Sequence, residues 1–162
     1  MVAAYAAIIA TGALFLEVRR WFESGPRLKV SVMSEAIIIG GGEEDHNTYL
    51  AITVTNTGTN PTTLTHMLLK EYRNSWDKLR GKSSFSGLVP RAAPAGGQEL
   101  PLKLDVGDVW HGQATYNGEL ALRAINGKLW VGVASSHNRR ELLQKVTIEP
   151  NTKLHEKFGM HR

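Results

Sequence analysis

YLAITVTNTGTNPTTLTHMLLKEY, residues 49–72, predicts the architecture of this chain more clearly than any other segment. In its first part, Leu50, Ile52 and Val54 alternate with smaller or polar side chains, which is the period of a half-buried β-strand. A dense turn signal, NTGTNP, follows, and the alternation then resumes. Two strands around a polar turn indicate either a hairpin or a corner between two sheets.

Further short strands are expected on both sides of this pair. Alternating or continuous apolar runs predict them at residues 28–32, 85–89, 100–104, 109–116, 128–135 and 142–148. A second apolar piece, residues 36–39, is expected to continue the first of these strands past a bend. Residues 118–126 have helical character and end at Asn126-Gly127, a favourable helix C-terminus. About seven or eight short strands separated by turn signals are typical of a β-sandwich.

The segment LAITVTNTGTNPTTLTHM, residues 50–67, resembles the V-x-N-x-G strand–turn–strand of immunoglobulin-like β-sandwich domains. This resemblance implies a fold and no activity. The expected fold class is therefore mainly β: an immunoglobulin-like sandwich of about 7–8 strands, with one N-terminal transmembrane helix and one short helix.

The N-terminal segment MVAAYAAIIATGALFLEVRRWF, residues 1–22, predicts the transmembrane helix, because its first sixteen residues carry no charge. Charged and aromatic side chains then cluster, which is typical of a membrane interface. The predicted membrane-interface residues are Arg19, Arg20, Trp21, Phe22 and Arg27. Small side chains let helix backbones approach closely, and the predicted helix-packing residues are Ala3, Ala7, Thr11 and Gly12.

Two alternatives exist for this N-terminal segment. A cleaved signal peptide needs basic residues before its apolar run and small residues after it, whereas here Arg19 and Arg20 follow the run. A buried helix of a soluble protein is the other alternative, since the run is short. With a transmembrane helix, the basic residues after it place the N-terminus outside and the following domain in the cytoplasm.

The expected domain organisation has three parts. Residues 1–23 form the transmembrane helix and its interfacial end, residues 27–149 form the β-sandwich, and residues 150–162 form a polar tail. The whole chain has 162 residues, which is room for one domain besides the helix. It contains no cysteine, which excludes disulfides, thiol catalysis and cysteine-based zinc sites.

The formal net charge of +4 is modest, but basic residues gather at particular places. One group, Arg73, Lys78, Arg80 and Lys82, surrounds Trp76. This segment, residues 74–84, is either an ordinary loop held in place by Trp76 or a short amphipathic helical turn that lies on a membrane or a partner. Few aromatic residues lie among the charges, so nucleic-acid binding is not expected.

No catalytic, nucleotide-binding or metal-binding motif is present, and the chain is expected to be neither an enzyme nor a cofactor-binding protein. The glycine-rich stretch at residues 40–47 contains Glu43, Glu44 and Asp45, which would repel phosphate. It predicts an exposed loop with at most a weak cation site. His66, His111 and His137 are isolated in the sequence, so satisfied or exposed histidines are favoured over a metal site.

Three segments together resemble a group of small bacterial proteins with one N-terminal span and a β-rich domain. They are ATGALFLEVRRWFESGPRLKVSVM, NTYLAITVTNTG and GKLWVGVASSH. The resemblance implies a protein of the bacterial inner membrane, in contact with the lipid bilayer, and implies no activity. The expected function is a non-enzymatic accessory or structural subunit that binds other membrane protein subunits. The alternative is a membrane-surface sensor or a ligand- or lipid-binding module.

Overall fold

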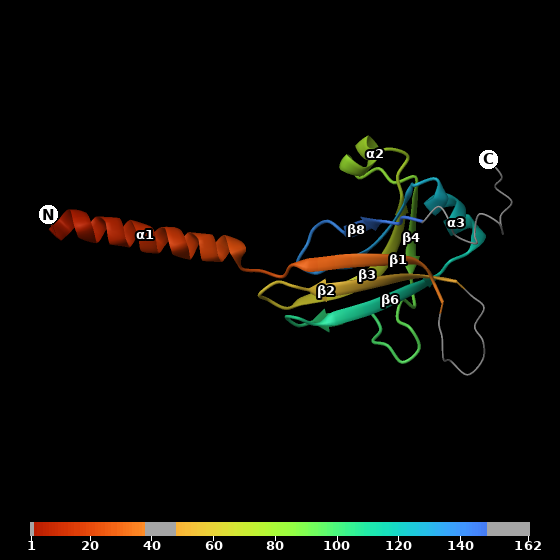
Figure 1. Ribbon diagram of the computed structural model, residues 1–162, viewed down its shortest axis with the longest axis horizontal. Helices are drawn as coiled ribbons and strands as arrows, with labels where there is room; N and C mark the ends of the chain where they lie inside the picture. The colour runs from red at the N-terminus through yellow and green to blue at the C-terminus, as the bar shows by residue number, and fades with distance from the viewer. Residues whose placement is uncertain (1, 38–47, 149–162) are drawn as a thin grey trace.

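The computed structural model describes residues 2–37 and 48–148, except for the side chains of residues 2–5, 7–8 and 22–23. A long helix precedes a domain of β-strands, which we call the β domain (Figure 1). The elements in chain order are α1 (Val2–Glu23), β1 (Leu28–Ala36), β2 (Tyr49–Asn56), β3 (Thr62–Glu71), α2 (Ser75–Leu79), β4 (Phe85–Val89), β5 (Leu102–Leu104), β6 (Val109–Thr115), α3 (Gly118–Ile125), β7 (Leu129–Ser135) and β8 (Leu142–Lys145).

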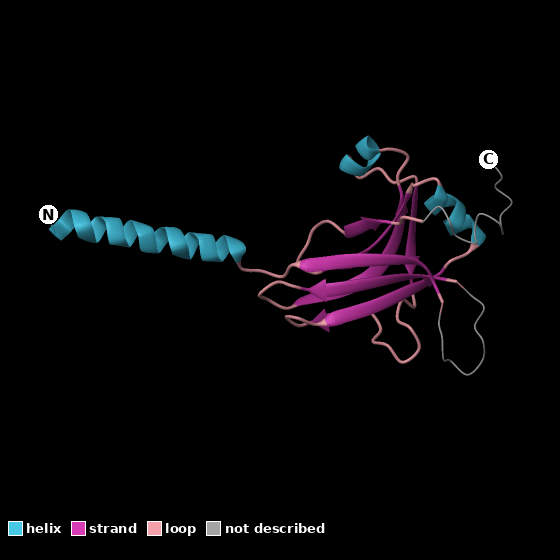
Figure 2. Cartoon of the chain, in the orientation of Figure 1, coloured by secondary structure: helices cyan, strands magenta, loops and turns pink. Residues whose placement is uncertain are grey.

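Within the described residues, the eight strands form two antiparallel sheets (Figure 2). One sheet has the order β1-β2-β6. The other has the order β4-β3-β7-β8, and β5 pairs with the first residues of β3. The prediction of a mainly β chain is therefore confirmed. The apolar piece that begins at Ala36 was expected to continue the first strand past a bend, and β1 does reach Ala36 through an irregularity after Met33. Residues 38–39 lie outside the described residues.

The segment at residues 49–72 forms a corner between the sheets. Strand β2 pairs with β1 and β6, whereas β3 pairs with β4, β5 and β7. The alternating side chains of β2 point into the core, where Leu50, Ile52 and Val54 are almost fully buried. They join Leu64 of β3 and Val131 of β7 in one hydrophobic cluster, so both sheets share one core.

Asn56 organises this corner from inside, because its side chain is fully buried. Its Nδ2 donates hydrogen bonds to the backbone oxygens of Asn60 (2.9 Å) and Leu104 (3.2 Å). Its Oδ1 accepts from the backbone N–H of Gly58 at 3.1 Å. One amide side chain therefore pairs with two backbone groups of the β2–β3 turn and one at the end of β5. Because the amide is buried, it needs these partners.

The transmembrane helix expected over residues 1–23 is not found as a span. In the part of the chain that the structure describes, no helix is long and apolar enough to cross a membrane. A helix does form there, but Glu17, Arg19 and Arg20 lie within its last two turns and shorten its apolar part.

Candidate functional site

Helix α1 projects away from the β domain as an arm (Figure 1). All of its described side chains, at residue 6 and from residue 9 to residue 21, are exposed. They include large apolar groups: Leu14 is 65% exposed, Phe15 67% and Trp21 73%. The β domain thus leaves most of the apolar surface of α1 uncovered.

These apolar side chains do not form a single stripe. At 3.6 residues per turn, Ile9 and Leu16 lie on the side of the helix opposite to Leu14 and Val18. A surface helix has one apolar face, whereas a helix that is apolar around its circumference is normally enclosed by other apolar groups. The apolar surface of α1 therefore faces more than one direction.

Backbone contacts fix the segment that joins α1 to the β domain. Thr57 N–H donates to the oxygen of Arg27 at 2.7 Å, and Thr59 N–H donates to the oxygen of Gly25 at 2.9 Å. The N–H of Gly25 in turn donates to Oγ1 of Thr59 at 3.0 Å. Gly58 is buried against this linker, residues 24–27. The β2–β3 corner therefore sets how the chain leaves α1.

The predicted interface residues gather at the end of α1 and in the linker. Arg19, Arg20, Trp21 and Arg27 are all exposed. The side chain of Phe22 lies outside the described residues, as do those of Ala3 and Ala7, whereas Thr11 and Gly12 are exposed on the helix. Contact with a membrane, or packing against other helices, stays a prediction for these residues.

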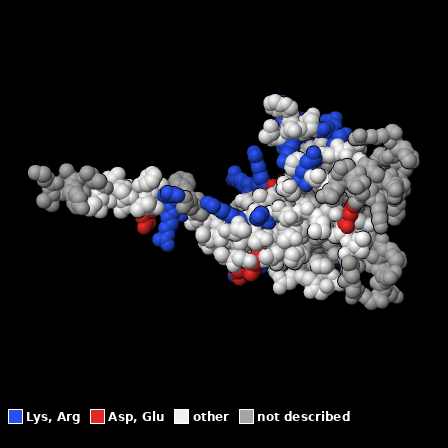
Figure 3. Space-filling view, viewed as in Figure 1, with Lys and Arg blue, Asp and Glu red and all other residues white. Residues whose placement is uncertain are grey.

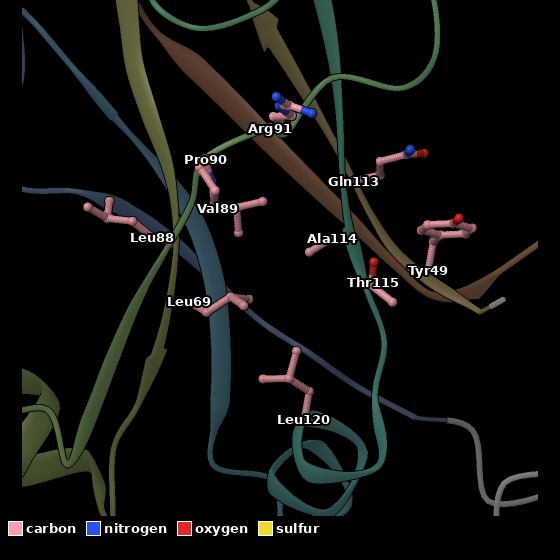
Figure 4. A pocket seen from close by; sticks show the side chains of 10 residues that line it. All are labelled: Tyr49, Leu69, Leu88, Val89, Pro90, Arg91, Gln113, Ala114, Thr115 and Leu120. Carbon is pink, nitrogen blue, oxygen red and sulfur yellow. The ribbon is translucent and has the colours of Figure 1, made fainter.

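A cleft of about 390 Å³ lies between the two sheets, where β4 and β6 are edge strands (Figure 4). Much of its wall is apolar, including Leu69, Leu88 and Leu120. Arg91 and Gln113 lie at the side of the cleft beyond Val89 and Pro90 (Figure 4). The lining thus combines apolar contact with one cation, Arg91, and the hydroxyls of Tyr49 and Thr115.

The sequence did not indicate this cleft. Its lining residues come from β2, β3, β4, β6 and the start of α3, and their meeting depends on which strands end up at the sheet edges. No local pattern around Arg91 or Gln113 predicts that arrangement.

The histidines that the structure describes come from different parts of the fold: β3, β6 and the turn after β7. His66, His111 and His137 are exposed, and Nδ1 of His111 lies 3.2 Å from Oγ1 of Thr53. Over residues 2–37 and 48–148, no group of three or more His, Asp or Glu side chains is placed to hold a metal ion. The acidic residues of the stretch 40–47 lie outside the described residues.

Tyr116, just after β6, is a buried tyrosine whose hydroxyl has no hydrogen-bond partner among the described residues. Burial raises its pKa to about 12, and the nearby negative charge of Glu35 adds to this effect. An unfolded tyrosine has a pKa of about 10, so above about pH 10 the unfolded chain loses this proton first. The free energy of unfolding therefore falls between about pH 10 and pH 12.

We expect Tyr116→Phe to remove this part of the alkaline instability. Near pH 7 the variant should be as stable as the wild type, or up to about 1 kcal/mol more stable, because no buried hydrogen bond is lost. Near pH 11 its advantage should grow by roughly 1–2 kcal/mol. Urea unfolding at both pH values measures the difference; an advantage that stays constant with pH would contradict the raised pKa.

Comparison with known proteins adds little to this description. No protein-family model and no curated protein matches the chain. Similar solved structures include a Bordetella pertussis crystal structure under the provisional name ApaA, at 11% identity and a TM-score of 0.37, over 80% of this chain and 98% of that one. Structural-genomics target SoR45 has 10% identity and a TM-score of 0.26, over 78% and 87% of the two chains. Likenesses this low carry no argument about function.

Proposed function

We propose that this chain is a non-enzymatic accessory subunit of a larger membrane protein complex. Helix α1 is the element that docks among the helices of a partner protein, and the β domain provides a second contact surface. One observation carries the proposal: every described side chain of α1 is exposed, and the apolar ones lie around its circumference. A subunit that acts by docking needs no catalytic group.

The free energy gained by covering apolar side chains favours the docking of α1 on a partner. In proteins, most of the stability of a helix comes from the packing of its apolar side chains. Five of its large side chains are more than half exposed: Ile9, Leu14, Phe15, Leu16 and Trp21. Covering each contributes about 1–2 kcal/mol, so together they offer on the order of 5–10 kcal/mol before the costs of association. That gain offsets much of the cost of association, and contacts made by the β domain would add to it.

The same proposal assigns the β domain to the immunoglobulin-like sandwiches. In such a sandwich, strands A, B and E share one sheet and strands C, F and G share the other. The orders β1-β2-β6 and β4-β3-β7-β8 agree with A-B-E and C′-C-F-G. Sandwiches of this kind present loops and strand edges to partners. This correspondence supports the β domain as a docking module.

The proposal also gives the β domain a place at the cytoplasmic face of a bacterial inner membrane. The supporting feature is the group of basic residues beside α1: Arg19, Arg20, Arg27 and Lys29. The cytoplasmic leaflet carries anionic lipids, which attract basic residues close to the membrane surface. The second candidate function, a membrane-surface module, is favoured by the exposed Trp76 and Leu79 of α2.

Purification of the tagged full chain from its native cells in mild detergent tests the proposal. We expect the wild type to elute with a partner in a fixed ratio, and the double variant Leu14→Glu, Phe15→Glu to lose at least nine-tenths of it, because two charges cannot be buried unpaired. The matched control is Val106→Glu, Val109→Glu, which changes exposed valines of the β domain. Wild-type chain that elutes alone would contradict the proposal.

A further inference from the structure

Helix α2 presents two large apolar side chains to solvent. Asn74 begins this short helix, and its Oδ1 accepts a hydrogen bond from Asp77 N–H at 2.8 Å. Trp76 is 69% exposed and Leu79 is 74% exposed. Because they are three residues apart, they lie on the same side of the helical turn. The loop interpretation supposed that Trp76 holds this segment to the domain, and its exposure shows that it does not.

Other residues hold α2 in place. Nζ of Lys78 lies 3.4 Å from the centroid of the Trp130 ring, a cation–π contact. The Trp130 ring also meets Tyr72 edge-on, with centroids 6.4 Å apart. Lys82 N–H donates to the oxygen of Asp77 at 2.8 Å. Trp76 and Leu79 are thus exposed on a helical turn that other contacts hold in place.

Positive charge surrounds these two side chains. The segment 73–82 contains four basic residues and one acid, Asp77, which pairs with Arg73 at 3.4 Å. Arg80 and Lys82 are exposed. Lys and Arg side chains gather on the side of the molecule that carries α2 (Figures 1 and 3). We call Trp76, Leu79, Arg80 and Lys82 the α2 patch.

We propose that the α2 patch docks on an anionic lipid surface. Tryptophan is favoured at the boundary between headgroups and acyl chains, and leucine beside it adds apolar contact. Arg80 and Lys82 complement negatively charged headgroups. A protruding pair of apolar groups needs a matching pocket on a protein, whereas a bilayer accepts it without one. The inference depends on α2 alone and stands apart from the docking of α1.

Sedimentation of the full chain with vesicles tests this inference. The vesicles contain phosphatidylcholine alone or phosphatidylcholine mixed with phosphatidylglycerol. We expect roughly tenfold tighter binding to the anionic vesicles, and a loss of about tenfold for Trp76→Ala, Leu79→Ala. Arg80→Gln, Lys82→Gln should lose most of the preference for anionic vesicles that the wild type shows, and its binding should depend less steeply on salt. Any binding through α1 is common to all these proteins.

Matched variants on the β domain serve as controls. Val106→Ala, Val109→Ala removes two exposed apolar side chains, and Arg91→Gln, Lys103→Gln removes two exposed charges. Both should bind anionic vesicles as the wild type does. Equal binding by the wild type and by the Trp76, Leu79 variant would overturn the inference. A second outcome would also overturn the inference: the wild type binds immobilised polyglutamate more strongly than vesicles, and the α2-patch variants lose that binding. The ligand would then be an acidic protein.

Discussion

Replacing Asn56 with aspartate is expected to lower the free energy of unfolding by about 3–5 kcal/mol, a large part of the stability of a typical domain. The two side chains have nearly the same size, but aspartate has no N–H donor. The carbonyl oxygens of Asn60 and Leu104 would lose their partner and face a buried negative charge. Only the bond from the N–H of Gly58 would persist.

Urea unfolding at neutral pH measures this effect. Asn60→Asp is the matched control, because it makes the same chemical change at an exposed side chain of the same turn. We expect that control to stay within about 0.5 kcal/mol of the wild type. If Asn56→Asp unfolded at the same urea concentration as the control, the buried amide would not organise the corner.

Gly58→Ala is expected to destabilise the protein by about 2–3 kcal/mol and to loosen the linker to α1. An added Cβ would overlap backbone atoms of Gly25 and Arg27, which cannot move aside as a flexible side chain can. The hydrogen bonds from Thr57 and Thr59 to the linker would then lengthen or break. The corner and the exit of α1 would be disturbed together.

Hydrogen exchange separates these two consequences. In Gly58→Ala, the amides of Thr57 and Thr59 should exchange at least tenfold faster than in the wild type, beyond the change that the core strands show. Gly12→Ala is the control, since a Cβ there meets nothing within 4 Å and alanine favours a helix. If the amides of Thr57 and Thr59 exchanged as slowly as in the wild type, the hydrogen bonds to the linker would not depend on the absence of a side chain at Gly58.

The strands were predictable because their signals are local. Leu50, Ile52 and Val54 alternate, and the same residues are buried in β2. The choice between hairpin and corner was not predictable, because it depends on distant partners: β2 pairs with β6, more than fifty residues along the chain. The role of Asn56 has the same origin, since one of its acceptors is the oxygen of Leu104.

The candidate surfaces were predictable only in part. The sequence predicted a helix over residues 1–22 and a possible helical turn near Trp76, and both helices form. The exposure of Trp76 and the contact between Lys78 and Trp130 are both features of the folded chain that no local pattern reveals. The predicted membrane span is not found among the described residues, although Glu17, Arg19 and Arg20 do belong to the same helix as the apolar run.

Site-specific photo-crosslinking in native cells tests the docking of α1 most directly. A photoreactive amino acid replaces Ile9 or Phe15, which lie on different sides of the helix, or Val106 of the β domain as the control; all three are exposed. We predict a discrete adduct with the same partner protein from both helix positions and none from Val106. Adducts with lipid alone, or no adduct from either helix position, would contradict the proposal that α1 docks among the helices of a partner.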